Sequence, residues 1–299
     1  MTFPRRSTLG TTAALACGLA GPAGAAPFVF STGGVNGLIA TASRPNPSSG
    51  PNLETESADD FVISGARTQV NSGSFTGLVP PGASIAGVTV EMYRVFQNDS
   101  NTGRTSGPPT FSTPQVPTRV NSPSDVALDS RSSGSGLSYT TAVLAPSFTA
   151  LNSVDTGINP KPGQTTGGEG PVTGQEVQFN VTFTSPFTLD PDHYFFVPQV
   201  LLADPAQHFR WLSASRPIDA TGTPFALGTT DLQAWIRNSG LDPDWLRIGT
   251  DVIGAGTFNM AFTLNGQTVP EPEPAAVAML AAGLLGLAAA RRPTGRRGR

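Results

Sequence analysis

The residues of this sequence best suited to chemistry are aspartates in turn-like positions. Asp190-Pro191-Asp192 and Asp242-Pro243-Asp244 repeat one tripeptide, and Asp59-Asp60 and Asp99 lie near expected strand ends. Carboxylates beside Gly-rich loops are ligands that Ca²⁺ accepts. The candidate metal ligands are therefore Asp190, Asp192, Asp242 and Asp244, and calcium is the one cofactor considered. Turn formation is the alternative role, because Asp accepts local backbone hydrogen bonds and Pro presets φ.

Two tryptophans are candidates for ligand contact. Trp211 and Trp245 could stack on sugar rings, as exposed aromatic side chains do in carbohydrate-binding domains. Burial in the core is the alternative for both, since most large aromatic side chains of a β domain lie inside.

No catalytic motif accompanies these residues. The two histidines, His193 and His208, lie outside any H-E-x-x-H spacing, and the chain has no G-x-S-x-G segment. Gly254-Ala255-Gly256 lacks the later glycine and the strand–helix context of a dinucleotide site. We therefore predict no catalytic residues and no enzymatic activity.

Period-2 alternation predicts the elements that position these residues. Val177, Phe179, Val181 and Phe183 alternate with polar residues, which is typical of a half-buried antiparallel strand. The expected strands are 28–31, 37–42, 60–64, 69–78, 85–96, 137–144, 176–184, 194–201, 209–212, 246–252 and 257–264. Together with 34 Gly and 28 Pro they predict an all-β fold, a single antiparallel β-sandwich of jelly-roll type.

One short helix is expected near residue 231. Thr230 to Gln233 matches a capping box, Leu232, Trp235 and Ile236 share one helical face, and Gly240 would end the helix. The Pro- and Ser-rich segment 98–136 and the polar segment 158–174 are predicted loops. They could form a binding rim or serve as linkers.

The charge of the chain argues against nucleic acid as a partner. Between Ala26 and Val269 there are 11 basic and 19 acidic residues, a net charge of about −8, and Lys161 is the only lysine of the chain. Nucleic-acid surfaces need clustered Lys and Arg. The single cysteine, Cys17, lies in the N-terminal apolar stretch, so a mature protein without that stretch has no disulfide.

The N-terminus has the three parts of a secretory signal peptide. Arg5 and Arg6 are positive, residues 11–19 are mostly apolar, and Ala23-Gly24-Ala25 gives a small-x-small site with cleavage before Ala26. We expect residues 1–25 to be removed on export. The general secretory and twin-arginine routes both stay open, since Thr8 stands where twin-arginine signals usually carry an aromatic residue.

The C-terminus carries a second sorting signal. Pro270-Glu271-Pro272 precedes an uncharged segment, residues 275–290, and a tail rich in arginine that begins with Arg291 and Arg292. At about 1.5 Å per residue the segment is short for a membrane span, but arginine snorkelling relieves such a mismatch. The order of these three parts resembles the PEP-CTERM sorting signal. That resemblance implies a transient inner-membrane helix and processing by an exosortase near Pro270–Pro272.

These features divide the chain into a signal peptide (1–25), a β domain (26–268) and a sorting signal (269–299). The preferred interpretation is an exported, non-enzymatic protein of the cell surface or extracellular matrix, associated with exopolysaccharide. The alternatives are a carbohydrate-binding module and a glycan hydrolase with a dispersed acidic site.

Overall fold

The computed structural model describes residues 24–46, 54–102, 116, 118–158, 165–215 and 231–270. Residues Ala25–Val269 form one compact unit. Within it the regular structure of the described residues consists of strands and one short helix, so the all-β prediction is confirmed. The predicted signal peptide, apolar helix and arginine tail lie outside the described residues. None of the helices in the described part of the chain is long and apolar enough to cross a membrane.

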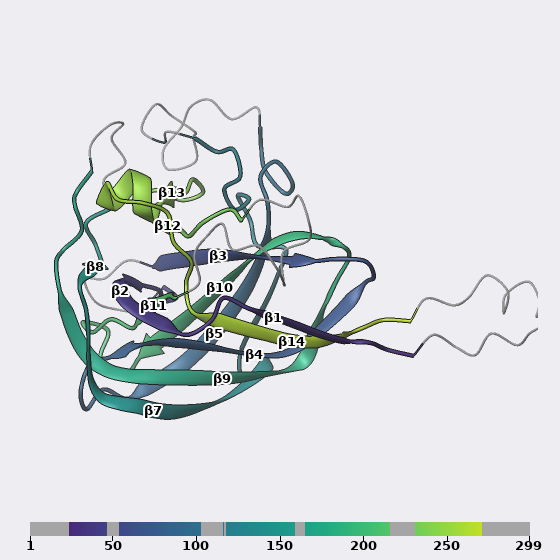
Figure 1. Ribbon diagram of the computed structural model, residues 1–299, viewed down its shortest axis with the longest axis horizontal. Coiled ribbons are helices and arrows are strands. Elements are labelled where there is room, and N and C mark those ends of the chain that lie inside the picture. Colours follow the sequence, from purple (N-terminus) through teal and green to yellow (C-terminus); the bar gives the residue numbers. More distant parts are fainter. Residues whose placement is uncertain are drawn as a thin grey trace, which may run out of the picture. The chain divides into compact units, whose positions relative to one another are not determined.

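In the described residues the chain forms fourteen strands and one short helix. Figure 1 shows their arrangement. The strands are β1 (Pro27–Ser31), β2 (Val35–Ala42), β3 (Thr55–Ile63), β4 (Thr68–Val79), β5 (Ile85–Arg94), β6 (Asp129–Ser133), β7 (Gly136–Ala150), β8 (Asn152–Val154), β9 (Val172–Leu189), β10 (Asp192–Leu202), β11 (Arg210–Ala214), β12 (Trp235–Asn238), β13 (Leu246–Arg247) and β14 (Phe262–Thr268). A π-helix, η1, covers Ile248–Ile253 between β13 and β14.

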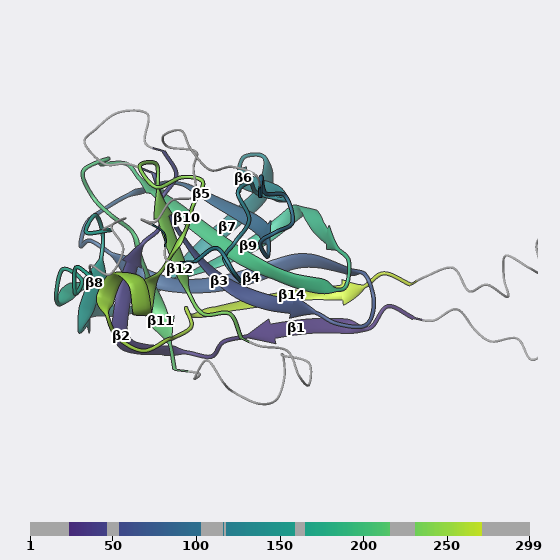
Figure 2. The same ribbon diagram turned by 90° about the horizontal axis from the view of Figure 1, so that it is seen from above.

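The strands follow one hydrogen-bonded path, mostly antiparallel. Its order is β13-β12-β3-β10-β5-β6-β7-β9-β4-β11-β2-β8. β14 pairs with β4 and with β1, so the first and last strands of the domain run side by side (Figures 1 and 2). The two halves of the path meet at β6 and β7, which pair through only two positions.

Aromatic side chains from the two halves of the path pack against one another in the core. Phe196 of β10 lies 6.3 Å from Phe75 of β4 and 5.1 Å from Phe262 of β14, measured between ring centroids. Phe30 of β1 likewise contacts Phe61 of β3 at 5.9 Å. Apolar burial between these strands is the main stabilising contribution.

The predicted alternation in residues 176–184 is confirmed. The side chains of Val177, Phe179, Val181 and Phe183 are all buried, whereas Asn180 and Thr182 are exposed. The strand is longer than predicted and extends from Val172 to Leu189. Length is set here by pairing with β4 and β7 on both edges, which the alternation alone does not report.

The predicted helix near residue 231 is wrong. Residues Trp235–Asn238 form β12, which pairs with β3 from Ala58 to Thr55. Gln233 has a φ of 66°, a left-handed conformation that no α-helix tolerates. The vacant edge of β3 offers hydrogen bonds and a buried site for Trp235, and these tertiary contacts outweigh the local capping pattern.

The strand predicted for residues 246–252 is also largely wrong. Only Leu246 and Arg247 are extended, and the chain then turns into η1, which ends at Gly254 in the left-handed conformation. Conversely, the predicted loop 98–136 contains β6, which pairs with β5. β6 is polar throughout, so its sequence has no alternation to reveal it.

Candidate functional site

An open cleft lies where β3, β5 and β12 meet the loop before β6. Its volume is about 370 Å³. It is lined by Glu54, Glu56, Glu91, Tyr93, Asp125, Val126, Ala127, Arg237, Ser239 and Asp242, and we call it the acidic cleft. This volume falls within the range of small-molecule sites, about 300–1,000 Å³.

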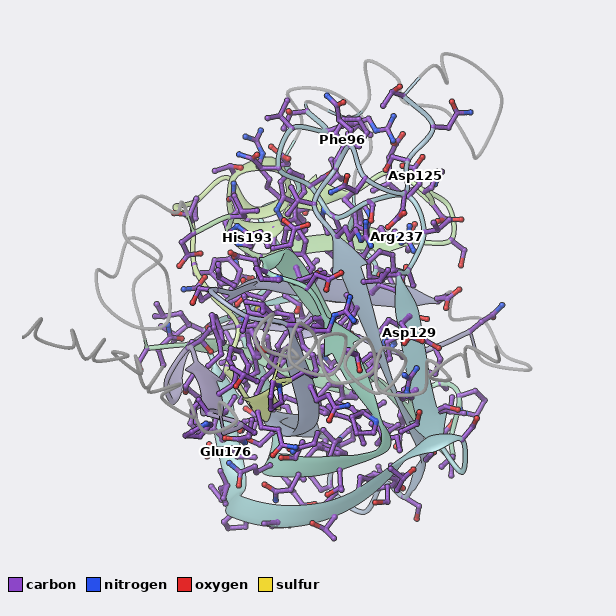
Figure 3. All side chains as sticks on the ribbon, turned by 90° about the vertical axis from the view of Figure 1, so that its right-hand side faces the viewer. Phe96, Asp125, Asp129, Glu176, His193 and Arg237 are labelled. Carbon is purple, nitrogen blue, oxygen red and sulfur yellow. The ribbon has the colours of Figure 1, made fainter. Side chains whose placement is uncertain are left out.

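Arg237 of β12 is the cation at the base of the acidic cleft. Its side chain is 7% exposed and forms an ion pair with Glu56. Nη2 donates to the Tyr93 hydroxyl at 2.8 Å, and Nη1 donates to the Asp125 carbonyl at 3.1 Å. Figure 3 labels Arg237 and Asp125 on the same side of the domain. Nη1 also lies 2.9 Å from Asp242 Oδ1. These partners occupy the guanidinium, so Arg237 organises the cleft and is not a free anion-binding group.

Two glutamates meet at the Tyr93 hydroxyl. The hydroxyl oxygen lies 2.8 Å from Glu56 Oε1 and 2.9 Å from Glu91 Oε2. A phenol has one proton and donates to only one of them. Both contacts are hydrogen bonds only when one of the two carboxyls is protonated and donates to the hydroxyl oxygen. Burial, followed by the charge of Glu56, raises the pKa of Glu91 to about 7, in accord with this proton count.

The lining of the acidic cleft is negative. Burial, with the charge of Glu56 next, also raises the pKa of Glu54 at the rim. Arg119 pairs with Asp125 and lies 3.4 Å from Asp244, so its charge is directed at those carboxylates. The cleft is therefore suited to groups that donate hydrogen bonds, and it repels anions.

Trp211 and Trp245 are both buried, at 0% and 1% exposure. The indole N–H of Trp211 donates to the Ala261 carbonyl at 2.9 Å, and that of Trp245 donates to the Ser124 carbonyl at 3.1 Å. Neither ring presents a face to solvent on which a sugar could stack. Trp245 instead packs against two residues that line the acidic cleft. Its ring centroid lies 5.4 Å from that of Tyr93 and 4.4 Å from the Arg237 guanidinium carbon.

The four aspartates of the repeated tripeptide lie in two separate turns. Asp190 and Asp192 flank the β9–β10 turn, where Asp190 forms an exposed ion pair with Arg67 at 2.7 Å. Asp242 lines the acidic cleft, and Asp244 is buried beside Arg119. In the described ranges no group of three or more His, Cys, Asp or Glu residues is arranged to hold a metal ion. Each of these turns is held by Asp–Arg pairing.

Asp59 and Asp60 lie in the middle of β3, not at its start, and both are buried. Asp59 Oδ2 accepts from the Met260 amide at 2.8 Å, and Asp60 Oδ1 accepts from the Leu232 amide at 3.0 Å while Oδ2 pairs with His193. Burial and the charge of Asp60 raise the pKa of Asp231 to about 8. These carboxyls tie the segments around β12 and β14 to β3.

The sequence did not single out Glu56, Glu91 or Arg237, the charged residues at the centre of the acidic cleft. Their signal is the i, i+2 spacing of Glu54 with Glu56 and of Glu91 with Tyr93, which places each pair on one face of a strand. In β5 the opposite face carries Val88, Val90 and Met92, all buried. Nothing in the sequence pairs these strands with Arg237, whose segment was expected to be helical.

No protein-family model matches the chain, and comparison with curated proteins and with solved structures found no match.

Proposed function

We propose that this chain is an exported protein of the cell envelope or extracellular matrix whose β domain binds polysaccharide in the acidic cleft. The observation that carries the proposal is the set of carboxylate acceptors around an open cleft whose one lining cation is already paired. Hydroxyl groups of a neutral glycan donate to such carboxylates. The carbohydrate-binding role, considered as an alternative from the sequence, thus becomes part of the preferred function.

The packed halves of the strand path support a β-sandwich of the jelly-roll type as the scaffold. Its loops at one end frame the cleft, as loops on rigid scaffolds often do. The two sorting signals proposed from the sequence are also part of this function. Residues 1–25 direct export, and the PEP-CTERM-like segment 269–299 gives a transient inner-membrane anchor that an exosortase processes.

The contacts of Glu56 and Glu91 support binding over hydrolysis. The two carboxyls share the Tyr93 hydroxyl, which lies 2.8 Å from Glu56 Oε1 and 2.9 Å from Glu91 Oε2. Glycoside hydrolases hold their carboxyl pair about 5–9.5 Å apart to leave room for the anomeric carbon or a water molecule. In the acidic cleft the Tyr93 hydroxyl lies between the two carboxyls and occupies that room.

Titration calorimetry with the producer's own polysaccharide tests the proposal on the protein recovered from the producing cells. We expect saturable binding that strengthens as pH rises through about 7, because the ionised Glu91 carboxylate is the better acceptor. Glu91→Gln should weaken binding by about tenfold or more, since a hydrogen bond to a charged group contributes about 1.5–3 kcal/mol.

Asp204→Asn is the matched control, because Asp204 is exposed in the turn after β10 and does not line the cleft. It should bind like the unmodified protein. Equal binding by the Glu91→Gln protein and the unmodified protein at pH 8 would place the glycan elsewhere. Trp211→Ala and Trp245→Ala are unsuitable tests, since both would open cavities in the core.

A further inference from the structure

The outer edge of β7 is unlike the other strand edges of the domain. β7 has 15 residues, none of them charged. One edge pairs with β9 from Leu137 to Ala150. The other edge pairs with β6 only at Gly136 and Leu137, and within the described ranges no further strand pairs with it. Figure 1 shows β7 as the outermost strand beside β9.

A strand in this position directs alternate backbone N–H and C=O groups away from its partner. Side chains from Thr140 to Leu144 are exposed, including Val143 at 58% and Leu144 at 53%. Protein edges are normally protected by short length, charged side chains or bulges. The ends of the strand path follow that rule, since β8 has three residues and β13 has two.

The protection of β7 is confined to one end. Register shifts relative to β9 begin after Val143, and Pro146 lies within the second of them. The stretch from Ser138 to Val143 keeps regular register and carries Tyr139, Thr140 and Thr141, which favour strands. Its length matches that of an ordinary strand, about five to six residues.

We infer that β7 is an assembly edge on which a second copy of this chain pairs through its own β7, antiparallel about a twofold axis. Two properties select a second copy as the occupant. The strand carries no charge, so two copies meet along β7 without like charges facing each other. Antiparallel pairing of two copies also gives hydrogen-bond partners to the free β7 edge of each copy in one contact. This is so because a twofold contact uses the same surface of both copies.

The pairing continues the β7–β9–β4 sheet of one protomer into that of its partner. It also covers part of the exposed Val143 side chain. The contact is independent of the acidic cleft, which is built from β3, β5 and β12. A matrix protein could in this way bind glycan and present two such sites per assembly.

Sedimentation equilibrium of the protein recovered from the producing cells tests this inference. We expect dimers that dissociate on dilution. Thr141→Lys and Thr141→Glu proteins should each be monomeric, because like charges meet across the twofold axis. An equimolar mixture of the two variants should restore the dimer, an outcome that a folding defect cannot produce.

Thr182→Lys is the matched control. Thr182 is also exposed, but it lies on β9, which is paired on both edges. This variant should remain dimeric. A protein that stays monomeric up to about 1 mM, the limit of weak association, overturns the inference. So does a Thr141→Lys protein that dimerises as strongly as the unmodified chain.

Discussion

At the residue scale, the centre of the acidic cleft is a shared-proton arrangement. The Tyr93 hydroxyl contacts both Glu56 and Glu91 and accepts a hydrogen bond from the Arg237 guanidinium. Each buried polar atom has a partner only while one carboxyl is protonated. Protonation near neutral pH is therefore coupled to folding and, in the proposed function, to glycan binding.

Glu91→Gln should reduce the pH dependence of stability. The raised pKa means that the folded state keeps this proton at pH values where the unfolded chain has released it. The stabilisation is fully present below about pH 4.5 and is lost as pH rises through about 7, so stability falls across that window. Gln mimics the neutral acid and removes this part of the slope.

Urea unfolding at pH 5 and pH 8 measures the effect. The free energy of unfolding of Glu91→Gln should change less between the two pH values than that of the unmodified protein. Asp231, whose pKa is raised to about 8, gives a slope of the same sign, so part of the dependence should persist. Identical slopes for Glu91→Gln and the unmodified protein would contradict the shared-proton arrangement.

At the element scale, close approach between strands decides where side chains fit. β4 pairs with β11 at Gly77, where an added Cβ would lie 2.3 Å from the Phe209 ring and 2.5 Å from the Arg210 carbonyl oxygen. Phe209 is fully buried and packs edge-on against Phe75 and Phe179. The glycine is what allows this aromatic cluster to seat against β4.

Gly77→Ala should therefore destabilise the domain by about 1–3 kcal/mol, the usual cost of overpacking a filled core. Gly34→Ala is the control, since an added Cβ there meets nothing within 4 Å. It should change stability by no more than about 0.5 kcal/mol. Chemical denaturation midpoints compare the two, and equal midpoints would show that β11 moves to accommodate the methyl group.

At the scale of the whole molecule, the two proposed sorting signals predict two proteolytic cleavages. Intact-mass analysis of the protein from the producer's medium and envelope should show a new N-terminus near Ala26 and a new C-terminus near Pro270. Attached hexose mass would link the product to the matrix. A mass that runs through Arg299 would mean that the tail is a stable anchor, and the sorting proposal would be withdrawn.

The sequence by itself determined the fold class, because alternation of apolar and polar residues reports which face of a strand is buried. Val177, Phe179, Val181 and Phe183 show this most directly. The same local signals are weak where pairing decides the conformation. Trp235–Asn238 carries a helix-like pattern but completes the edge of β3, and polar β6 is a strand only because β5 lies beside it.

Only the tertiary structure decided which polar residues form a site. Glu56, Glu91 and Arg237 come from three strands far apart in the sequence, and their contacts depend on strand order and register. The tertiary structure likewise placed Trp211 and Trp245 in the core. The sequence could not decide this, because a tryptophan has the same one-letter code whether it is buried or exposed. The type of each side chain is local information. Its burial and its hydrogen-bond or ion-pair partners are decided only when distant strands pack together.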